Sequence, residues 1–243
     1  MAELSWVTPT GRPDALPATP LLLGEQPALA YPYAYAGLAR EIAAAPAIAL
    51  TVSEPRMTGS GWRALAATGR ATLVEDPEGE LFRERLLREE LRKYPPSRAL
   101  ADSLILQREN WWYLPRLIVL LDLRPSTPVE PRTEGGHQVL TMWDGDLLYV
   151  DTVSVVQVGS DRLKLASLSG RPAVDGPAAL LGHDFSVPDL ERWTPWVTRG
   201  MVTGDLLSII DRPTRTILEP NLSLRQRYRR QRDLEKACRA NLP

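Results

Sequence analysis

The fold of this chain is decided by residues 28–76, whose sequence is ALAYPYAYAGLAREIAAAPAIALTVSEPRMTGSGWRALAATGRATLVED. The tyrosines and small apolar residues of 28–35 predict a strand, because such side chains suit a pleated surface. Apolar residues at helical spacing predict a short helix over 37–45, and the proline that follows ends it. Residues 47–53 are apolar and short enough for a buried strand, and 62–75 predict a longer strand after a glycine-rich turn. The stretch therefore predicts the order strand, helix, strand, turn, strand.

Further strands are predicted on both sides of this stretch. Residues 1–35 predict three strands, with a turn at 10–13 between the first two. The almost continuous apolar run at 117–123 predicts a buried strand. Beyond it, Asp144 and Gly145 form the strongest short turn signal of the chain and predict a hairpin. Strands therefore dominate, and the fold class is mainly β, of the α+β type.

Three helices are expected after residue 75. Residues 76–96 predict the first, because Asp76 can cap a helix and Pro77 suits its first position. The second is expected over 99–110. The third is expected over 221–243, where the segment RQRYRRQR makes the helix basic and leaves it only a narrow apolar stripe.

Several segments carry a family resemblance. They are AAAPAIAL at the end of the first helix, the strand ATGRATLVED, the opening hairpin LSWVTPTGRPDALPATPLLLG and the closing strand RLIVLLDLR. Over residues 3–124 these segments and their order resemble the FMN-binding split β-barrel family, which contains the pyridoxamine 5'-phosphate oxidases. The resemblance implies a split β-barrel, FMN or a deazaflavin as cofactor, and a homodimer with cofactor sites between the subunits.

An internal repeat links the two halves of the chain. Pro46 and Pro177 lie 131 positions apart (177 − 46), and so do Gly69 and Gly200 (200 − 69). The same offset joins Arg40 to Arg171, Leu50 to Leu181 and Trp62 to Trp193. The repeat predicts that the split-barrel core occurs a second time, in shortened form.

The repeat and a linker-like segment predict the domain organisation. Residues 125–136 have the proline, glycine and threonine content of a linker. The expected parts are a complete split-barrel domain at 1–125, a second split-barrel-like half at 137–211 and a C-terminal helix at 221–243. One chain would then imitate the family's homodimer as an intrachain pseudo-dimer, and a true homodimer is the alternative.

The resemblance also implies where the cofactor phosphate is held. In the family, a serine and a lysine precede the helix-ending proline by ten and eight residues. The corresponding residues are Ala36 and Leu38 in the first copy, and Ser167 and Ser169 in the second. The second copy therefore keeps two hydroxyl groups, while both copies lack the lysine.

A flavin site needs cations or hydroxyl groups for its phosphate, because a dianion must be paired. Arg56 is the first candidate, since it lies in a turn just before Gly59 and Gly61. The candidate cofactor-binding residues are Arg56, Arg63, Tyr33, Arg40, Ser167, Ser169 and Arg171.

Structural roles compete with three of these assignments. Arg40 is expected on the exposed face of the short helix, and Arg63 is expected to point outward from a strand. Tyr33 would pack on one face together with Tyr31 and Tyr35, because alternate residues of a strand share a face.

Composition excludes several kinds of site. The single cysteine, Cys238, excludes an internal disulfide and a cysteine-cluster metal site. The two histidines, His137 and His183, are too few for a multi-histidine metal site or a triad, so no metal is expected. His183 is expected to be a satisfied surface or core residue. No residue stands out as a general acid or base, so no catalytic group is assigned.

Charge and hydropathy limit the expected partners. The net charge of −1 gives no general attraction to nucleic acid or membrane. The chain starts without a signal-peptide pattern, and no apolar run reaches the roughly 18 residues that a membrane span needs. A cytoplasmic location and a small-molecule partner are expected, without a membrane partner.

The sequence thus supports two main functional hypotheses. The first is a flavin- or deazaflavin-binding oxidoreductase with an unknown substrate. The alternative is a non-catalytic small-ligand-binding or structural split-barrel protein that has lost the cofactor site, so enzymatic activity is left open. Nucleic-acid binding through the basic C-terminal helix ranks last, because a solvated or interface helix explains the same residues.

Overall fold

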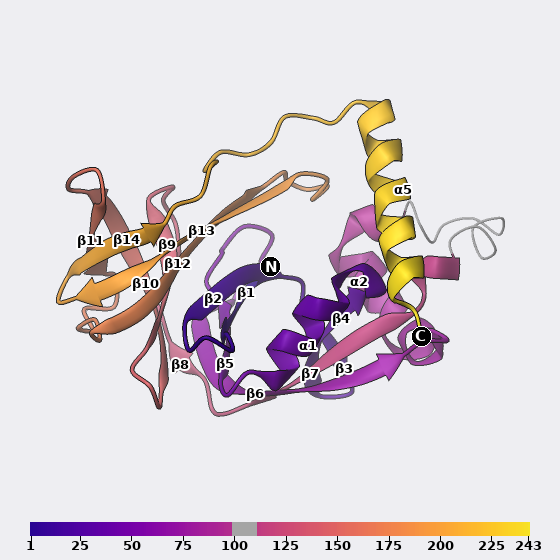
Figure 1. Cartoon of the computed structure of the whole chain (residues 1–243), viewed down its shortest axis with the longest axis horizontal. Coiled ribbons are helices and arrows are strands. Elements are labelled where there is room, and N and C mark those ends of the chain that lie inside the picture. The colour runs from indigo at the N-terminus through magenta and orange to yellow at the C-terminus, as the bar shows by residue number, and fades with distance from the viewer. Residues whose placement is uncertain (99–110) are drawn as a thin grey trace.

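The structure is a computed structural model that describes residues 1–98 and 111–243, so the helix expected over 99–110 lies outside the described residues. Two β bodies lie side by side, and a long C-terminal helix stands at the far end of the first body (Figure 1). The chain is mainly β, with a closed six-stranded barrel, a second sheet and a C-terminal helix. The predicted fold class is confirmed at this level.

The first body is one sheet with the strand order β2-β1-β5-β6-β7-β4-β3, and β8 pairs with β6. Its strands are β1 (Ala2–Val7), β2 (Pro13–Ala18), β3 (Leu21–Leu23), β4 (Gln26–Pro32), β5 (Ile48–Val52), β6 (Leu65–Asp76), β7 (Arg116–Leu123) and β8 (Thr127–Pro128). The short helix α1 (Ala36–Ala44) ends just before Pro46, as predicted. The predicted opening hairpin and the predicted strands at 47–53, 62–75 and 117–123 are confirmed, with ends shifted by a few residues.

The second body is a closed barrel with the order β10-β11-β14-β13-β12-β9. Its strands are β9 (His137–Trp143), β10 (Leu148–Gln157), β11 (Arg162–Ser167), β12 (Gly176–Phe185), β13 (Trp193–Thr203) and β14 (Leu206–Asp211). The hairpin predicted at Asp144 and Gly145 joins β9 to β10. The barrel closes because β10 pairs with β9 on one side and with β11 on the other.

The two bodies share one connectivity. The strand order of the first body, starting at β2, is β2-β1-β5-β6-β7-β4. The order of the barrel, starting at the equivalent strand β10, is β10-β9-β12-β13-β14-β11. Gly69 and Gly200 lie at equivalent places, because a Cβ on Gly69 would lie 1.9 Å from the Asp122 carbonyl oxygen of β7. A Cβ on Gly200 would lie 2.1 Å from the Ser208 carbonyl oxygen of β14. Only glycine lets the neighbouring strand approach so closely.

Closure distinguishes the two bodies. The sequence predicted a split-barrel domain in the first copy and a second split-barrel-like half, without deciding whether that half closes. In the structure the second body is the closed barrel, whereas the first is a sheet whose order ends at β2 and β3. In the first body β4 pairs with β7 and β3, so β3 takes the edge through which β4 would otherwise meet β2. In the second body the equivalent strand β11 closes directly on β10.

β1 shows how the bodies pack, because all six of its residues are buried. Leu4 and Trp6 point into the core of the first body. Glu3 and Ser5 point the other way, toward the barrel, where the hydroxyl oxygens of Ser5 and Thr141 lie 2.7 Å apart. A strand covered on both faces can carry polar side chains only where partners meet them.

The expectation that three tyrosines share a strand face is wrong. β4 ends at Pro32, and Tyr33 and Tyr35 lie in a 3-10 turn, η1 (Tyr33–Tyr35). Tyr33 is fully buried, whereas Tyr35 is exposed. A turn directs successive side chains around an axis rather than to alternate faces, so the period of two does not apply here.

The helix expected over 76–96 is confirmed over residues 80–93, where the α-helix contains a π-helical turn, but it starts later and ends earlier than expected. A turn at Gly79, with φ of +69°, separates Asp76 from the helical residues. The helical segments are the π-helix η2 (Phe82–Leu86), α2 (Leu87–Lys93) and the 3-10 turn η3 (Pro95–Ser97). Asp76 still satisfies the start of this region, because its Oδ2 accepts the backbone N–H of Phe82 at 2.8 Å.

Helix α5 (Leu224–Asn241) begins at Ser223, whose hydroxyl oxygen accepts the backbone N–H of Gln226. Only its C-terminal half packs on the first body, where Leu234 and Cys238 join the core near η1 and η4 (Trp111–Tyr113). Among the helices that the structure describes, none is both long and apolar enough to cross a membrane.

Candidate functional site

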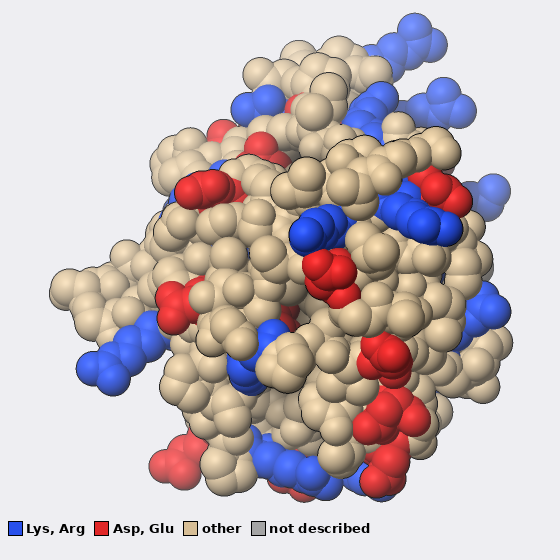
Figure 2. Space-filling model, turned by 90° about the vertical axis from the view of Figure 1, so that its left-hand side faces the viewer, with Lys and Arg blue, Asp and Glu red and all other residues tan. Residues whose placement is uncertain are grey.

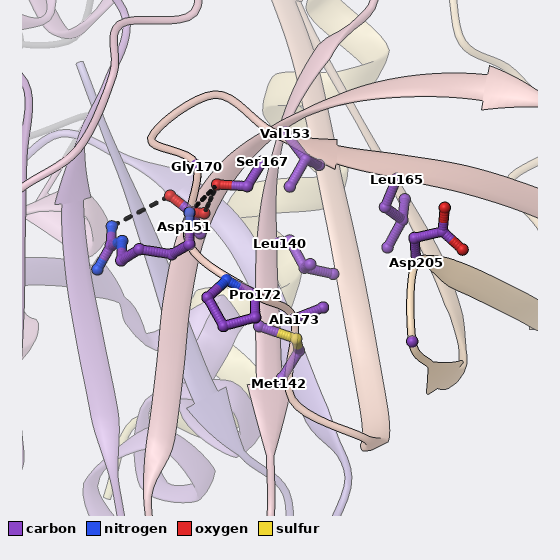
Figure 3. A pocket seen from close by; sticks show the side chains of 12 residues that line it. Leu140, Met142, Asp151, Val153, Leu165, Ser167, Gly170, Pro172, Ala173 and Asp205 are labelled. Carbon is purple, nitrogen blue, oxygen red and sulfur yellow. Dashed lines mark hydrogen bonds and ion pairs between the residues drawn. The ribbon is translucent and has the colours of Figure 1, made fainter.

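A pocket of about 400 Å³ opens at one end of the barrel, and we call it the mouth pocket (Figure 3). Its floor is apolar, because Leu140, Met142, Val153 and Leu165 alternate toward the barrel interior. Its rim consists of Asp151, Ser167, Gly170, Arg171, Pro172, Ala173, Gly204 and Asp205. The loop 168–175, between β11 and β12, supplies much of this rim.

One carboxylate organises the polar side of the rim. Ser167 Oγ donates to Asp151 Oδ2 at 2.5 Å, and Ser169 Oγ donates to Asp151 Oδ1 at 2.9 Å. Arg171 Nη2 lies 3.1 Å from the same Oδ1. Arg171 also donates from Nε to Ser169 Oγ at 2.9 Å. Asp151 thus gathers two hydroxyl groups and one guanidinium group, and Figure 3 shows its contact with Ser167.

The three site residues predicted in the second copy therefore lie together. Ser167, Ser169 and Arg171 form the donor set that a phosphate would need. In the structure these donors are directed at Asp151, which is itself an anion. A ligand phosphate at this place would compete with Asp151 and be repelled by its charge. The sequence reasoning missed Asp151, which lies 16 residues before Ser167 and shows its role only through the pairing of β10 with β11.

The four candidates from the first copy lie elsewhere. Tyr33 is buried in the first core, and Arg63 is exposed and precedes β6 rather than pointing outward from a strand. Arg40 is exposed and pairs with Glu75, its Nη2 lying 3.0 Å from Oε1. The structure does not bring these residues to the mouth pocket.

Arg56 belongs to the junction between the bodies. Its Nε lies 2.8 Å from Glu54 Oε1, and its Nη1 lies 2.7 Å from Asp184 Oδ1 of β12. Its guanidinium lies over the ring of Phe185, 4.0 Å from the centroid. Two carboxylates already neutralise this cation, and the hydrogen bonds that it donates to Glu54 are the largest of the effects that raise its pKa.

A buried polar network continues this junction. Glu3 Oε1 lies 2.7 Å from Arg132 Nη2 and 3.0 Å from His183 Nε2. Ser53 Oγ donates to Glu3 Oε1 at 3.1 Å and accepts from Arg132 Nε at 2.9 Å. Its residues come from β1, the end of β5, the segment after β8, and β12, so the network joins both bodies.

Burial and pairing have opposite effects on the pKa values of Glu3 and His183 in this network. Burial works to raise the pKa of Glu3, but the hydrogen bonds and positive charge from His183 and Arg132 outweigh it, so the pKa is lowered. Burial also lowers the pKa of His183, against the opposing effect of Glu3. His183 is a core residue, and within the described chain its Nδ1 has no hydrogen-bond partner, so the expected satisfied histidine is satisfied on one nitrogen only.

Two further pockets lie at equivalent places between the bodies. One, of about 440 Å³, combines Pro46 and Gly69 of the first body with the β9–β10 hairpin at 146–148. The other, of about 240 Å³, combines Pro177 and Gly200 of the barrel with Arg12 and Pro13 of the β1–β2 hairpin. These pairs of residues are the ones that the offset of 131 relates (177 − 46 and 200 − 69). The bodies are therefore arranged with approximate twofold symmetry.

The comparisons with known proteins add little to this geometry. No protein-family model matches the chain, and no curated protein matches it. A solved structure described as "Structure of heme binding protein from Mycobacterium smegmatis" is similar at 11% identity and a TM-score of 0.34, covering 98% of this chain and 92% of that one. A likeness at this level carries no argument about function. The mainly β fold with its closed barrel is shown, whereas membership of the FMN-binding family is not confirmed.

Proposed function

We propose that the protein binds a small, largely apolar molecule in the mouth pocket. The observation that carries this proposal is the combination of an apolar floor with one polar cluster in a concave site of about 400 Å³. Small-molecule sites typically have volumes of about 300–1,000 Å³ and a few placed polar groups in a mainly apolar lining. This is the non-catalytic small-ligand-binding hypothesis of the sequence analysis, now with a defined site.

The rim favours a ligand that donates hydrogen bonds over one that carries an anion. Among the described residues that line the pocket, Arg171 is the only cation, and Asp151 already pairs with it. A second carboxylate, Asp205, also lines the pocket. The matching ligand is uncharged or weakly cationic, with one hydroxyl or amino group directed at Asp151.

A flavin or deazaflavin fits this donor set poorly. Its phosphate would need Ser167, Ser169 and Arg171, which Asp151 engages. We therefore derive no oxidoreductase step for the pocket. Asp151→Asn makes the distinction testable, because it removes the competing charge while keeping the size of the side chain. If FMN is the natural ligand, wild type binds it at micromolar concentration and Asp151→Asn changes little; our proposal expects negligible binding by wild type.

The proposal is tested by titrating the protein with Nile red, an uncharged apolar dye, and following its fluorescence. Ala173→Trp fills the mouth pocket from its rim and should weaken dye binding at least tenfold. Thr216→Trp is the matched control, because Thr216 lines a separate pocket at another part of the barrel. Equal binding by wild type and Ala173→Trp, or a larger loss in Thr216→Trp, would place the dye elsewhere and overturn the proposal.

A further inference from the structure

Helix α5 carries a stripe of cations whose ion pairs and side-chain hydrogen bonds with described residues all lie within the helix itself. The stripe consists of Arg225, Arg229, Arg232, Lys236 and Arg239, which follow one another at spacings of four, three, four and three residues. Residues with this spacing lie above one another on a single helix face. At a rise of about 1.5 Å per residue, the stripe extends over roughly 20 Å. We call it the basic stripe.

The basic stripe points away from the body. Leu234 and Cys238, which pack α5 against the first core, lie on the opposite side of the helix. Residues 223–233 are all exposed, and the N-terminal half of α5 projects beyond the first body (Figure 1). It meets the β12–β13 loop of the barrel through Arg227, which is not part of the stripe and pairs with Glu191 at 2.8 Å. The barrel face looks different, because it shows both signs of charge interspersed among uncharged residues (Figure 2).

The N-terminal half of α5 is electrostatically unfavourable by itself. Five arginines and no acidic residue occur in residues 223–232. The positive end of the helix dipole disfavours cations in the first turns, and like charges four residues apart repel each other. Arg225, Arg229 and Lys236 form no ion pair with any described residue, while Arg239 pairs with Glu235 at 3.0 Å. An anionic partner would relieve this repulsion.

We propose that the basic stripe binds the phosphodiester backbone of single-stranded nucleic acid. Charge complementarity requires a polyanion, since cations succeed one another about every 5 Å along the stripe. Tyr228 is exposed beside the stripe, and its hydroxyl accepts from Arg232 Nε at 2.9 Å. The Arg232 guanidinium lies over one face of the ring, 5.4 Å from its centroid, so an unpaired base would stack on the opposite face. A membrane surface fits less well, because a helix lying in a bilayer buries an apolar face and this face has none.

The test is fluorescence anisotropy with labelled oligo(dT), measured between about 50 and about 200 mM salt. Five phosphate contacts on a single strand predict a log–log salt slope of about −3.5. The triple variant Arg225→Gln, Arg229→Gln, Arg232→Gln keeps helix-forming side chains and should bind at least tenfold more weakly, with a slope near −1.4. Tyr228→Leu should weaken binding severalfold without changing the slope.

The matched control is Arg83→Gln, Arg85→Gln, Arg88→Gln, which removes three exposed arginines from η2 and α2. This variant changes the net charge equally and should keep wild-type affinity and slope. Circular dichroism confirms that α5 remains helical in every variant. Equal losses in the two triple variants, or no binding by wild type, would overturn the proposal. Retention on anionic phosphatidylglycerol vesicles without oligo(dT) binding would also overturn it, in favour of a lipid surface.

Discussion

The two β bodies have the same strand connectivity, but one has a filled core and the other has a pocket. In the first body, the link between β4 and β5 contains η1 and α1, whose Tyr33, Ala36 and Ile42 fill the core. In the second body, the equivalent link between β11 and β12 is the loop 168–175, which forms no helix. The loop leaves the barrel end hollow, and that hollow is the mouth pocket.

The link between β6 and β7 also differs from the equivalent link between β13 and β14, because only the first contains helices. In the first body, 77–115 carries η2, α2, η3 and η4 between β6 and β7. In the barrel, a tight turn at Gly204, with φ of +60°, joins β13 to β14. The comparison teaches that helices in these links fill the core of the first body, whereas their absence from the equivalent links of the barrel leaves a pocket at its end.

The junction between the bodies should give the largest effect. Glu3→Ala removes the carboxylate nearest to buried Arg132 and leaves this cation only the longer ion pair with Glu54, at 3.6 Å, which should lower the free energy of unfolding by about 3–5 kcal/mol. Urea denaturation followed by both tryptophan fluorescence and circular dichroism measures the loss. If the bodies unfold in two separate transitions in the wild type already, the junction does not join them energetically.

The contrast between a filled core and a hollow barrel end can be measured directly. Ile42→Ala leaves a cavity beneath α1 and should cost about 2–5 kcal/mol. Leu165→Ala enlarges a pocket that is already open to solvent, so its cost should lie at the low end of that range, near 2 kcal/mol. Thermal denaturation of both variants provides the comparison, which fails if Leu165→Ala is the more damaging change.

Acid should weaken the junction before it affects the apolar cores. The pKa of His183 is lowered from 6.5 and that of Glu3 from 4.5, so the unfolded chain binds more protons than the folded one in both cases. Stability is therefore full above the unfolded pKa values and falls as the pH drops below about 6.5, then further below about 4.5.

The charged groups around Glu3 and His183 in this junction are Glu54, Arg56, Arg132 and Asp184. Urea unfolding at several pH values measures the trend, and His183→Gln should flatten it between pH 7 and 5. If the stability of His183→Gln depends on pH as that of the wild type does, His183 does not cause the loss of stability.

The smallest effect is expected on the surface of the first body. Arg40→Gln breaks the ion pair with Glu75, in which both side chains are substantially exposed. Pairs of this kind contribute about 0–1 kcal/mol, because water and salt screen them. The variant should also leave Nile red binding unchanged, since Arg40 is remote from the mouth pocket. A loss of dye binding would mean that the first body contributes to the site.

The sequence alone predicted much of the local structure. Pro46 predicted the end of α1, and Asp144 and Gly145 predicted the hairpin. Of the donors that the resemblance singled out, Ser167 and Arg171 line the mouth pocket of our proposal, and Ser169 lies beside them. The sequence could not show that Asp151 engages those donors, because that contact depends on the register between β10 and β11. It also missed the network of Glu3, Arg132 and His183, whose members are far apart in the chain.

There is a physical reason why the sequence predicted local elements but not the contacts between distant strands. Turns, caps and proline-terminated helices depend on residues a few positions apart, so the sequence by itself determined the turns, the end of α1, most strands and the 131-residue spacing of the two copies. Closure of the second barrel, opening of the first sheet and pairing of Ser5 with Thr141 depend on contacts between residues as much as 136 positions apart. Which edges meet is decided by the packing of whole sheets, and only the tertiary structure decided it.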